Sequence, residues 1–208
     1  MYSTRFALAV LTPLAFVACG TPEGLDQTYE DEEVQSVASP LTVTTGTGFA
    51  WPLNRAESGD GNFAACGRAY YTDIRHNGTD LAAPVGTPAY AVAAGTVRAI
   101  SGPKATSGWG DGNYAVMIEH TSSKGKFLAV YGHIRSLTVA SGSRVDLGQA
   151  LGNVGPYAGG NHLHFGVLPG TTVPPSGWGR VSDPSCKNPL ALNGFVSPIG
   201  YITTNSPR

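Results

Sequence analysis

Glycines and prolines interrupt this chain so often that only short elements of secondary structure fit between them. The 208 residues include 28 glycines and 15 prolines, and no amphipathic helical pattern is found after residue 46. Charged residues make up 13% of the chain, about half of the roughly 25% typical of soluble domains, which excludes a coiled coil or long-helix protein. Hydrophobic residues, at 41%, still suffice for a packed core. No apolar run reaches the roughly 18 residues of a membrane-spanning helix.

Short β-favouring runs lie between these interruptions. They occupy residues 89–100 with a break at Gly95, 113–119, 126–131, 144–151 and 163–168. The polar stretch 121–125 has the composition of a hairpin loop, and residues 169–189 are expected to form an irregular surface loop. Strands at this spacing, without helices between them, predict an all-β and mainly antiparallel domain. We expect a curled sheet or sandwich core with long surface loops and few or no helices.

Two histidine patterns are candidates for a metal site. His162 and His164 are two residues apart, so they share one face if they lie on a strand. His76 and Asp80 flank an Asn-Gly turn signal that can fold the carboxylate back beside the imidazole. Each pattern alone also fits a polar loop or exposed strand histidines. Together they offer two imidazoles and a carboxylate, the number of protein ligands of a catalytic zinc site, whereas four histidines would close the site and make it structural.

Three motifs occur in order between residues 76 and 165. They read HNGTDLAAPVGTP at 76–88, YGHI at 131–134 and NHLHF at 161–165. With a glycine-rich connecting segment at 142–155, they resemble the motifs of the lysostaphin-type zinc metallopeptidases, except that Ile134 stands where that family usually has Leu. The resemblance covers about residues 70–168.

This resemblance implies an enzyme with one Zn²⁺ ion. Carried over position by position, it implies that His76, Asp80 and His164 are the metal ligands and that His133 and His162 are catalytic histidines that do not bind the metal. A metal-activated water would attack a peptide carbonyl, with the two histidines moving protons, in an order that the sequence leaves open. The family's substrates imply peptide bonds of bacterial peptidoglycan, in the cross-bridge or the stem peptide.

Two alternative functions stay open. Members of the family that have lost metal ligands bind peptidoglycan and regulate other wall hydrolases, and a surface metallopeptidase could act on proteins. All five expected positions are filled here, which favours the enzyme. A net charge of −1 excludes a strongly basic nucleic-acid binder, so we expect no nucleic-acid partner. We also expect a monomer.

The N-terminus predicts export. Arg5 is followed by an apolar run of about 13 residues, a length that fits a signal peptide over residues 1–18. The sequence FVACG at 16–20 resembles a bacterial lipoprotein signal, which implies that Cys19 is lipidated and anchors the chain to a bacterial membrane, facing the periplasm or on the outer membrane. An ordinary cleaved signal and a secreted protein is the alternative. Residues 19–45 are acidic, lack Lys and Arg, and predict a flexible linker before a metallopeptidase domain at 46–208.

Two further cysteines remain if Cys19 is lipidated. In an oxidising compartment, Cys66 and Cys186 are expected to form a disulfide that pins the 169–189 loop, with two free buried thiols as the alternative.

Four other residues have structural or functional interpretations. His120 is expected to be structural or at the rim of the site, and Tyr131 to lie in the core rather than beside the reacting atoms. Trp109 is expected to anchor its glycine-rich loop, with a place in the cleft as the alternative. The turn role of Asn77 suffices to explain it, although it could also orient a ligand.

Overall fold

The computed structural model describes residues 43–66, 74–103, 109–110, 112–184, 186–188 and 192–208. All of them belong to one compact unit, Ala38–Arg208. The predicted signal peptide, Cys19 and most of the acidic linker lie outside the described residues. Thr45, at the predicted end of that linker, is buried, and its Oγ1 accepts a hydrogen bond from the Phe49 amide at 3.1 Å. The packed structure is therefore already present at residue 45.

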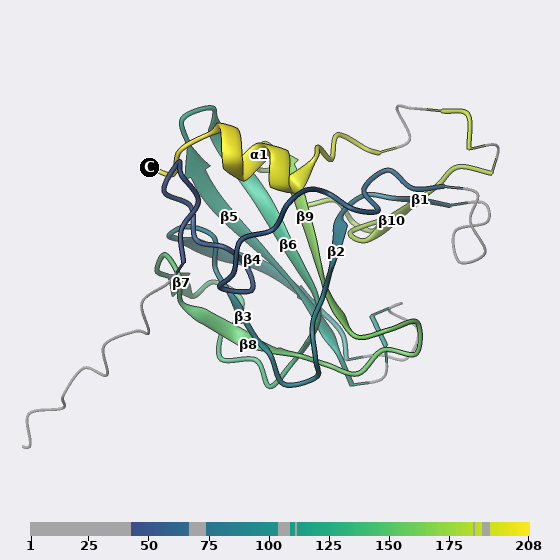
Figure 1. Cartoon of the computed structure of the whole chain (residues 1–208), viewed down its shortest axis with the longest axis horizontal. Helices are drawn as coiled ribbons and strands as arrows, with labels where there is room; N and C mark the ends of the chain where they lie inside the picture. The colour runs from purple at the N-terminus through teal and green to yellow at the C-terminus, as the bar shows by residue number, and fades with distance from the viewer. Residues whose placement is uncertain (1–42, 67–73, 104–108, 111, 185, 189–191) are drawn as a thin grey trace, which may run out of the picture. The chain divides into compact units, whose positions relative to one another are not determined.

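The unit is an antiparallel β-structure with one short helix among the described residues (Figure 1). Its elements are β1 (Ile74–His76), β2 (Thr79–Ala82), β3 (Pro88–Tyr90), β4 (Gly95–Ser101), β5 (Tyr114–Ser122), β6 (Gly125–Arg135), β7 (Arg144–Val145), β8 (Ala150–Val154), β9 (His162–Pro169), β10 (Arg180–Ser182) and α1 (Pro198–Thr204). Eight strands form one sheet with the order β2-β9-β6-β5-β4-β7, to which β8 adds through β6 and β3 through β8. Strands β1 and β10 form a separate two-stranded sheet. The predicted all-β fold class is confirmed.

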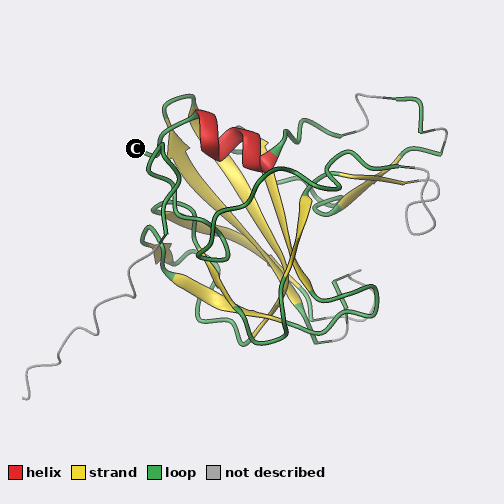
Figure 2. Ribbon diagram, in the orientation of Figure 1, coloured by secondary structure: helices red, strands yellow, loops and turns green. Residues whose placement is uncertain are grey.

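The two faces of the large sheet carry different cores. On β6, Phe127, Ala129 and Tyr131 belong to the larger hydrophobic core, whereas Leu128 and Val130 belong to the smaller one. This alternation follows from the two-residue period of a strand. The larger core is closed by α1, which contacts β9 and is drawn in red in Figure 2. The helix carries no residues toward the histidines described below.

The same alternation on β9 separates the core from the histidines. Leu163, Phe165 and Val167 enter the larger core. His162 and His164 therefore lie on the opposite face, as the spacing of the pair predicts. His164 stands opposite Gly132 in the β6–β9 register, and a Cβ on Gly132 would come within 2.3 Å of the Trp109 ring. The glycine thus leaves room for the indole beside the histidine.

Most of the expected strands are confirmed, with longer or divided bounds. The run 89–100 is divided into β3 and β4, and 144–151 into β7 and the start of β8. The hairpin expected at 121–125 is tighter than predicted, because β5 continues to Ser122 and β6 begins at Gly125. In the described part of the chain, no helix has the length and apolar character needed to cross a bilayer.

Three short strands were not predicted. The polar-loop interpretation of 76–80 is wrong on both sides of the Asn77-Gly78 turn, because β1 ends at His76 and β2 begins at Thr79. The expectation of an irregular 169–189 loop is wrong at β10, which pairs with β1. Each of these strands is stabilised by a partner about 80 to 110 residues away in the sequence, so no local pattern marks it.

The predicted disulfide is confirmed. Cys66 and Cys186 are bonded, with their Cα atoms 5.6 Å apart. The bond joins the segment before β1 to the segment after β10.

Candidate metal centre

Strand pairing brings together three of the predicted site residues. His76 is the last residue of β1, and Asp80 lies on β2 after the Asn-Gly turn. In the antiparallel register of β2 and β9, Asp80 stands directly opposite His164. One carboxylate and one imidazole thus come from neighbouring strands, and the second imidazole reaches them from across the turn.

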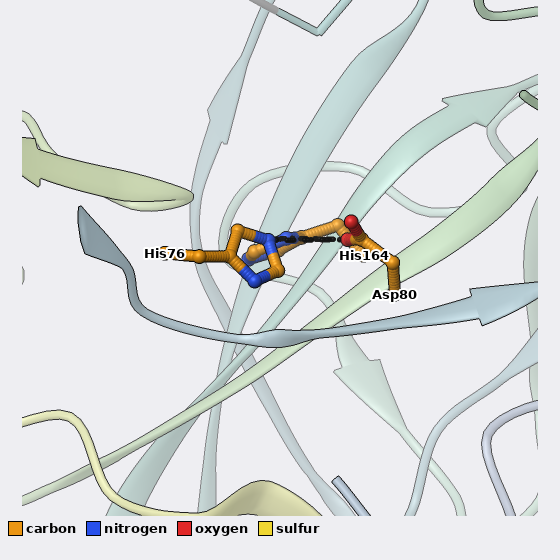
Figure 3. Close-up of side chains that lie close together, drawn as sticks. All are labelled: His76, Asp80 and His164. Carbon is orange, nitrogen blue, oxygen red and sulfur yellow. Dashed lines mark hydrogen bonds and ion pairs between the residues drawn. The ribbon is translucent and has the colours of Figure 1, made fainter. Parts of the chain in front are cut away.

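The three potential ligand atoms form a compact triangle (Figure 3). Nε2 of His76 lies 3.0 Å from Nδ1 of His164, and Oδ1 of Asp80 lies 3.2 Å from each of these nitrogens. Ligands about 2.0 Å from a tetrahedral zinc ion are roughly 3.3 Å apart, so the spacing fits such an ion. The residues present therefore fit one metal ion with three protein ligands.

The pKa shifts of Asp80 and His164 suit metal binding. Burial alone would raise the pKa of Asp80, but the neighbouring imidazoles of His162, His164 and His76 lower it far below its usual range. Burial lowers the pKa of His164. An ionised carboxylate and a neutral imidazole are the forms that bind a metal ion.

Glycine 78 explains the spacing of the first motif. A Cβ at this position would lie 2.4 Å from Nε2 of His164 and 2.8 Å from the carbonyl oxygen of Phe165. Only a residue without a side chain lets the turn pass this close to β9. Nε2 of His164 is buried and has no hydrogen-bond partner among the described residues, so Nδ1 is the nitrogen that the site uses.

His133 lies beside the triangle on β6, and its backbone has a φ of +60°. Nδ1 donates a hydrogen bond to the Trp109 carbonyl oxygen at 2.7 Å, which leaves Nε2 as the acceptor nitrogen. Burial lowers the pKa of His133 to about 3, so its imidazole is neutral. A left-handed backbone at a non-glycine residue is uncommon and recurs at functional sites.

His162 completes the cluster. Its Nδ1 donates to the Gly160 carbonyl oxygen at 2.7 Å, its Nε2 lies 3.3 Å from Oδ1 of Asp80, and its ring centroid is 4.4 Å from that of His133. Burial opposes protonation of His162, but the hydrogen bond and the charge of Asp80 outweigh it and raise its pKa. The two histidines that are not in the triangle therefore have opposite proton preferences.

A cleft of about 1080 Å³ opens over these residues. The three ligand candidates and both further histidines line it, together with aromatic side chains and a glycine-rich stretch at 158–160. Tyr157 packs against His133 and His162, with ring centroids 4.2 and 5.3 Å apart. Trp178 and Arg180 also line the cleft, from the loop and strand that the disulfide joins to residue 66.

The structure also places the four other residues that the sequence analysis considered. His120 is fully buried in the larger core, where its Nδ1 donates to the Ala94 carbonyl oxygen at 3.1 Å and its Nε2 accepts from the Tyr131 hydroxyl at 3.2 Å. The structural interpretation of His120 and the core interpretation of Tyr131 are thus confirmed. Trp109 both anchors its loop and lines the cleft. Asn77 donates to the Gly177 carbonyl oxygen at 2.6 Å and so ties the turn to the cleft wall.

Sequence reasoning missed two residues at the site. Asn62 contacts both His76 and Asp80 from a loop that precedes β1, where no motif marks it. Tyr157 stands five residues before His162, and its closeness to the NHLHF motif was the one available signal.

Residues 74–175 match the family described as Peptidase family M23. They form an M23 peptidase domain. This M23 segment contains the three ligand candidates together with His133 and His162. Asn62 and both disulfide cysteines lie outside it.

Named relatives are similar to part of the chain. The peptidoglycan DD-endopeptidase ShyC of Vibrio cholerae is 37% identical over 95 residues, which is 45% of this chain and 20% of ShyC. The cell division protein DipM of Caulobacter vibrioides is 30% identical over 146 residues, which is 67% of this chain and 22% of DipM. The chain thus spans about a fifth of the length of these relatives. The catalytic domain of lysostaphin from Staphylococcus simulans aligns over 71% of this chain and 91% of that chain, at 20% identity and a TM-score of 0.47.

Proposed function

We propose that this protein is a zinc-dependent endopeptidase that hydrolyses peptide bonds in bacterial peptidoglycan. The observation that carries the proposal is the triangle of His76, Asp80 and His164 at 3.0–3.2 Å on the wall of a cleft, with two further histidines beside it. The donor set of two imidazoles and one carboxylate is that of a catalytic zinc site and leaves one position open. Zinc is therefore the ion that we propose.

Bound zinc would supply Lewis acidity toward the scissile carbonyl and would lower the pKa of a water molecule toward 7. His133 is suited to accept a proton, because its Nδ1 bond to the Trp109 carbonyl oxygen leaves Nε2 as the acceptor nitrogen. His162 is suited to donate a proton to the leaving amine, because Asp80 favours its protonated form. Both histidines are held by backbone carbonyl oxygens, so their rings keep one orientation.

A cross-linked stem peptide is the proposed substrate. The Vibrio cholerae relatives ShyA, ShyB and ShyC are each named peptidoglycan DD-endopeptidases. A cleft of about 1080 Å³ that is lined by glycines and aromatic rings has room for a peptide. Arg180 in the cleft wall offers a cation to the free carboxylates of stem peptides. The activity belongs in the cell envelope, and lipidation of Cys19 and the monomeric state stay predictions.

The test uses the purified full chain with its disulfide formed and isolated peptidoglycan sacculi. We expect new free amino groups at one peptide bond, identified by mass spectrometry, which disappear with a chelator and return with zinc. Asp80→Asn should abolish both product and zinc binding because it removes the anionic ligand. The matched Asp146→Asn variant, at an exposed turn residue, should behave as the wild type.

Three outcomes decide between the alternatives. Zinc binding and peptide cleavage in a protein substrate, with sacculi intact, would replace peptidoglycan by protein as the substrate. Binding to sacculi without zinc binding or cleavage would favour the regulatory module and overturn the enzyme. Cleavage that survives complete zinc removal would overturn the metal-dependent mechanism.

A further inference from the structure

Residues 60–66, which we call the clasp, run along the metal centre before the M23 segment begins. At its middle, Asn62 makes three hydrogen bonds to the two ligand residues nearest to it. Its Nδ2 donates to Oδ2 of Asp80 at 2.7 Å, and its Oδ1 accepts from the Asp80 amide at 2.9 Å. Its carbonyl oxygen accepts from Nδ1 of His76 at 3.1 Å.

These bonds divide the Asp80 carboxylate into two unlike oxygens. Oδ2 is held by Asn62, while Oδ1 faces His76 and His164 at 3.2 Å from each nitrogen. A carboxylate that is held in this way offers one oxygen to an ion rather than two. Hydrogen bonds to ligating carboxylates fix their orientation and support metal affinity.

The clasp also determines which nitrogen of His76 is available. Because a carbonyl oxygen can only accept, Nδ1 of His76 carries the proton, and Nε2 keeps its lone pair toward the other ligands. Two backbone hydrogen bonds reinforce the position: Ala64 donates to the His76 carbonyl oxygen at 2.9 Å, and His76 donates to the Ala65 carbonyl oxygen at 3.0 Å.

Both ends of the clasp are anchored. At the first end, Oδ1 of Asp60 accepts from the Ile199 amide at the start of α1 at 2.8 Å, and the Asp60 carbonyl oxygen accepts from the Thr79 hydroxyl at 2.7 Å. At the other end, Cys66 is bonded to Cys186. Anchors on both sides limit the drift of the Asn62 side chain relative to β1 and β2.

We infer that Asn62 is a positioning residue of the metal centre: its side chain occupies Oδ2 of Asp80, so that Oδ1 is presented to the ion. Its backbone carbonyl oxygen, which a substitution keeps, holds the Nδ1 proton of His76 and leaves Nε2 for the ion. The inference rests on the proposed metal site and extends it beyond the M23 segment. Partners of this kind typically contribute 10-fold to 100-fold in metal affinity. Asn62 does not touch the ion, and it acts through Asp80 and His76.

The experiment measures zinc affinity of the full, disulfide-bonded chain by competition with a chromogenic chelator. We expect Asn62→Ala to bind zinc roughly 10-fold to 100-fold more weakly than the wild type. Asn62→Asp should be weakened at least as much, because it loses the donor and sets a second carboxylate against Asp80. Asn205→Ala is the matched control, since the side chain of this asparagine bonds to α1 at 2.9 Å and 3.2 Å and Asn205 does not belong to the described lining of the cleft.

A second readout separates positioning from general stability. With Co²⁺ in place of zinc, Asn62→Ala frees Oδ2 of Asp80 to bind as a second oxygen, and the higher coordination number should weaken the visible absorption. A merely structural role would lower the melting temperature and leave this spectrum unchanged. If Asn62→Ala does not fold, Asn62→Asp, which keeps the side-chain volume, decides with the same two measurements.

The outcomes distinguish this inference from the proposed function. A wild-type chain that binds no zinc would overturn the metal site and the inference with it. A wild-type chain that binds zinc, with Asn62→Ala within about twofold of it and an unchanged cobalt spectrum, would overturn the positioning role of the Asn62 side chain alone.

Discussion

His120 in the larger core and His133 in the cleft are both buried, but they differ in what their second ring nitrogen contacts. In the larger core, both nitrogens of His120 have protein partners, the Ala94 carbonyl oxygen and the Tyr131 hydroxyl. In the cleft, His133 donates from Nδ1 to the Trp109 carbonyl oxygen and keeps Nε2 as an acceptor. Half-buried His162 also donates from Nδ1 to a backbone carbonyl oxygen, but its Nε2 lies 3.3 Å from Oδ1 of Asp80. A fully satisfied imidazole serves stability, whereas a half-satisfied imidazole is oriented but still has a nitrogen for chemistry. Burial by itself does not separate the two roles.

The largest expected effect comes from His133→Ala. The variant loses the proposed base, so kcat should fall by roughly 10²–10⁴-fold. Its zinc affinity and melting temperature should stay near those of the wild type, because His133 is not in the ligand triangle. Sacculus digestion and chelator competition measure the two properties. A large loss of stability with little loss of activity would contradict the role of His133 as a base.

His120→Ala should lower stability and leave activity nearly unchanged, the opposite of His133→Ala. The variant leaves the Tyr131 hydroxyl without its acceptor and opens a cavity in the larger core, which should cost roughly 3 kcal/mol of unfolding free energy. Activity per folded molecule should hardly change, since His120 is absent from the cleft lining. Urea unfolding and activity at low temperature test this, and a strong drop in kcat with normal stability would contradict it.

Gly78→Ala should weaken metal binding by displacing the His164 ring. The new methyl group would meet His164 at 2.4 Å, so the ring must shift, and zinc should bind roughly 10-fold more weakly. Gly59→Ala is the matched control because a Cβ there meets nothing within 4 Å. Equal zinc affinity in both variants would show that the turn has room to move.

The smallest effect is a pH dependence of stability that belongs to the satisfied histidine. Burial lowers the pKa of His120 to about 4, below the ordinary value of 6.5. Between these two pH values the unfolded chain binds more protons than the folded chain, so this contribution to stability rises with pH and is lost on acidification. Between pH 5 and pH 6 it amounts to roughly 1 kcal/mol. Urea unfolding at both values should show this difference in the wild type, and His120→Asn should lack it; equal slopes would contradict the assignment.

The sequence predicts which residues form the site, but it does not predict how they are arranged in space. The motif at 76–88 and the NHLHF motif predict His76, Asp80 and His164 as metal ligands without any geometry, because each motif is local. Their meeting depends on the β2–β9 register, which sets Asp80 opposite His164 from 84 residues away. Strand β2 itself was missed, since four residues carry too weak a pattern to indicate a strand without its partner.

Asn62 marks the limit of sequence reasoning at this site. It belongs to no motif, and asparagine in a glycine-containing loop is ordinarily explained by the turn. Its three hydrogen bonds to His76 and Asp80 exist because the clasp is folded back along β1 and anchored at Asp60 and Cys66. Only the folded chain brings that loop to the ligands.

By itself, the sequence determined the class of fold, the positions of most strands, the disulfide and the residues that meet at the candidate site. These follow from local composition, from the two-residue period of strands and from short motifs. The tertiary structure decided which histidine is satisfied and which is not, which oxygen of Asp80 faces the ligand triangle, and which loop supports it. The physical reason is that hydrogen-bond partners are assigned by non-local strand pairing and packing, and these have no signature in any single stretch of the chain.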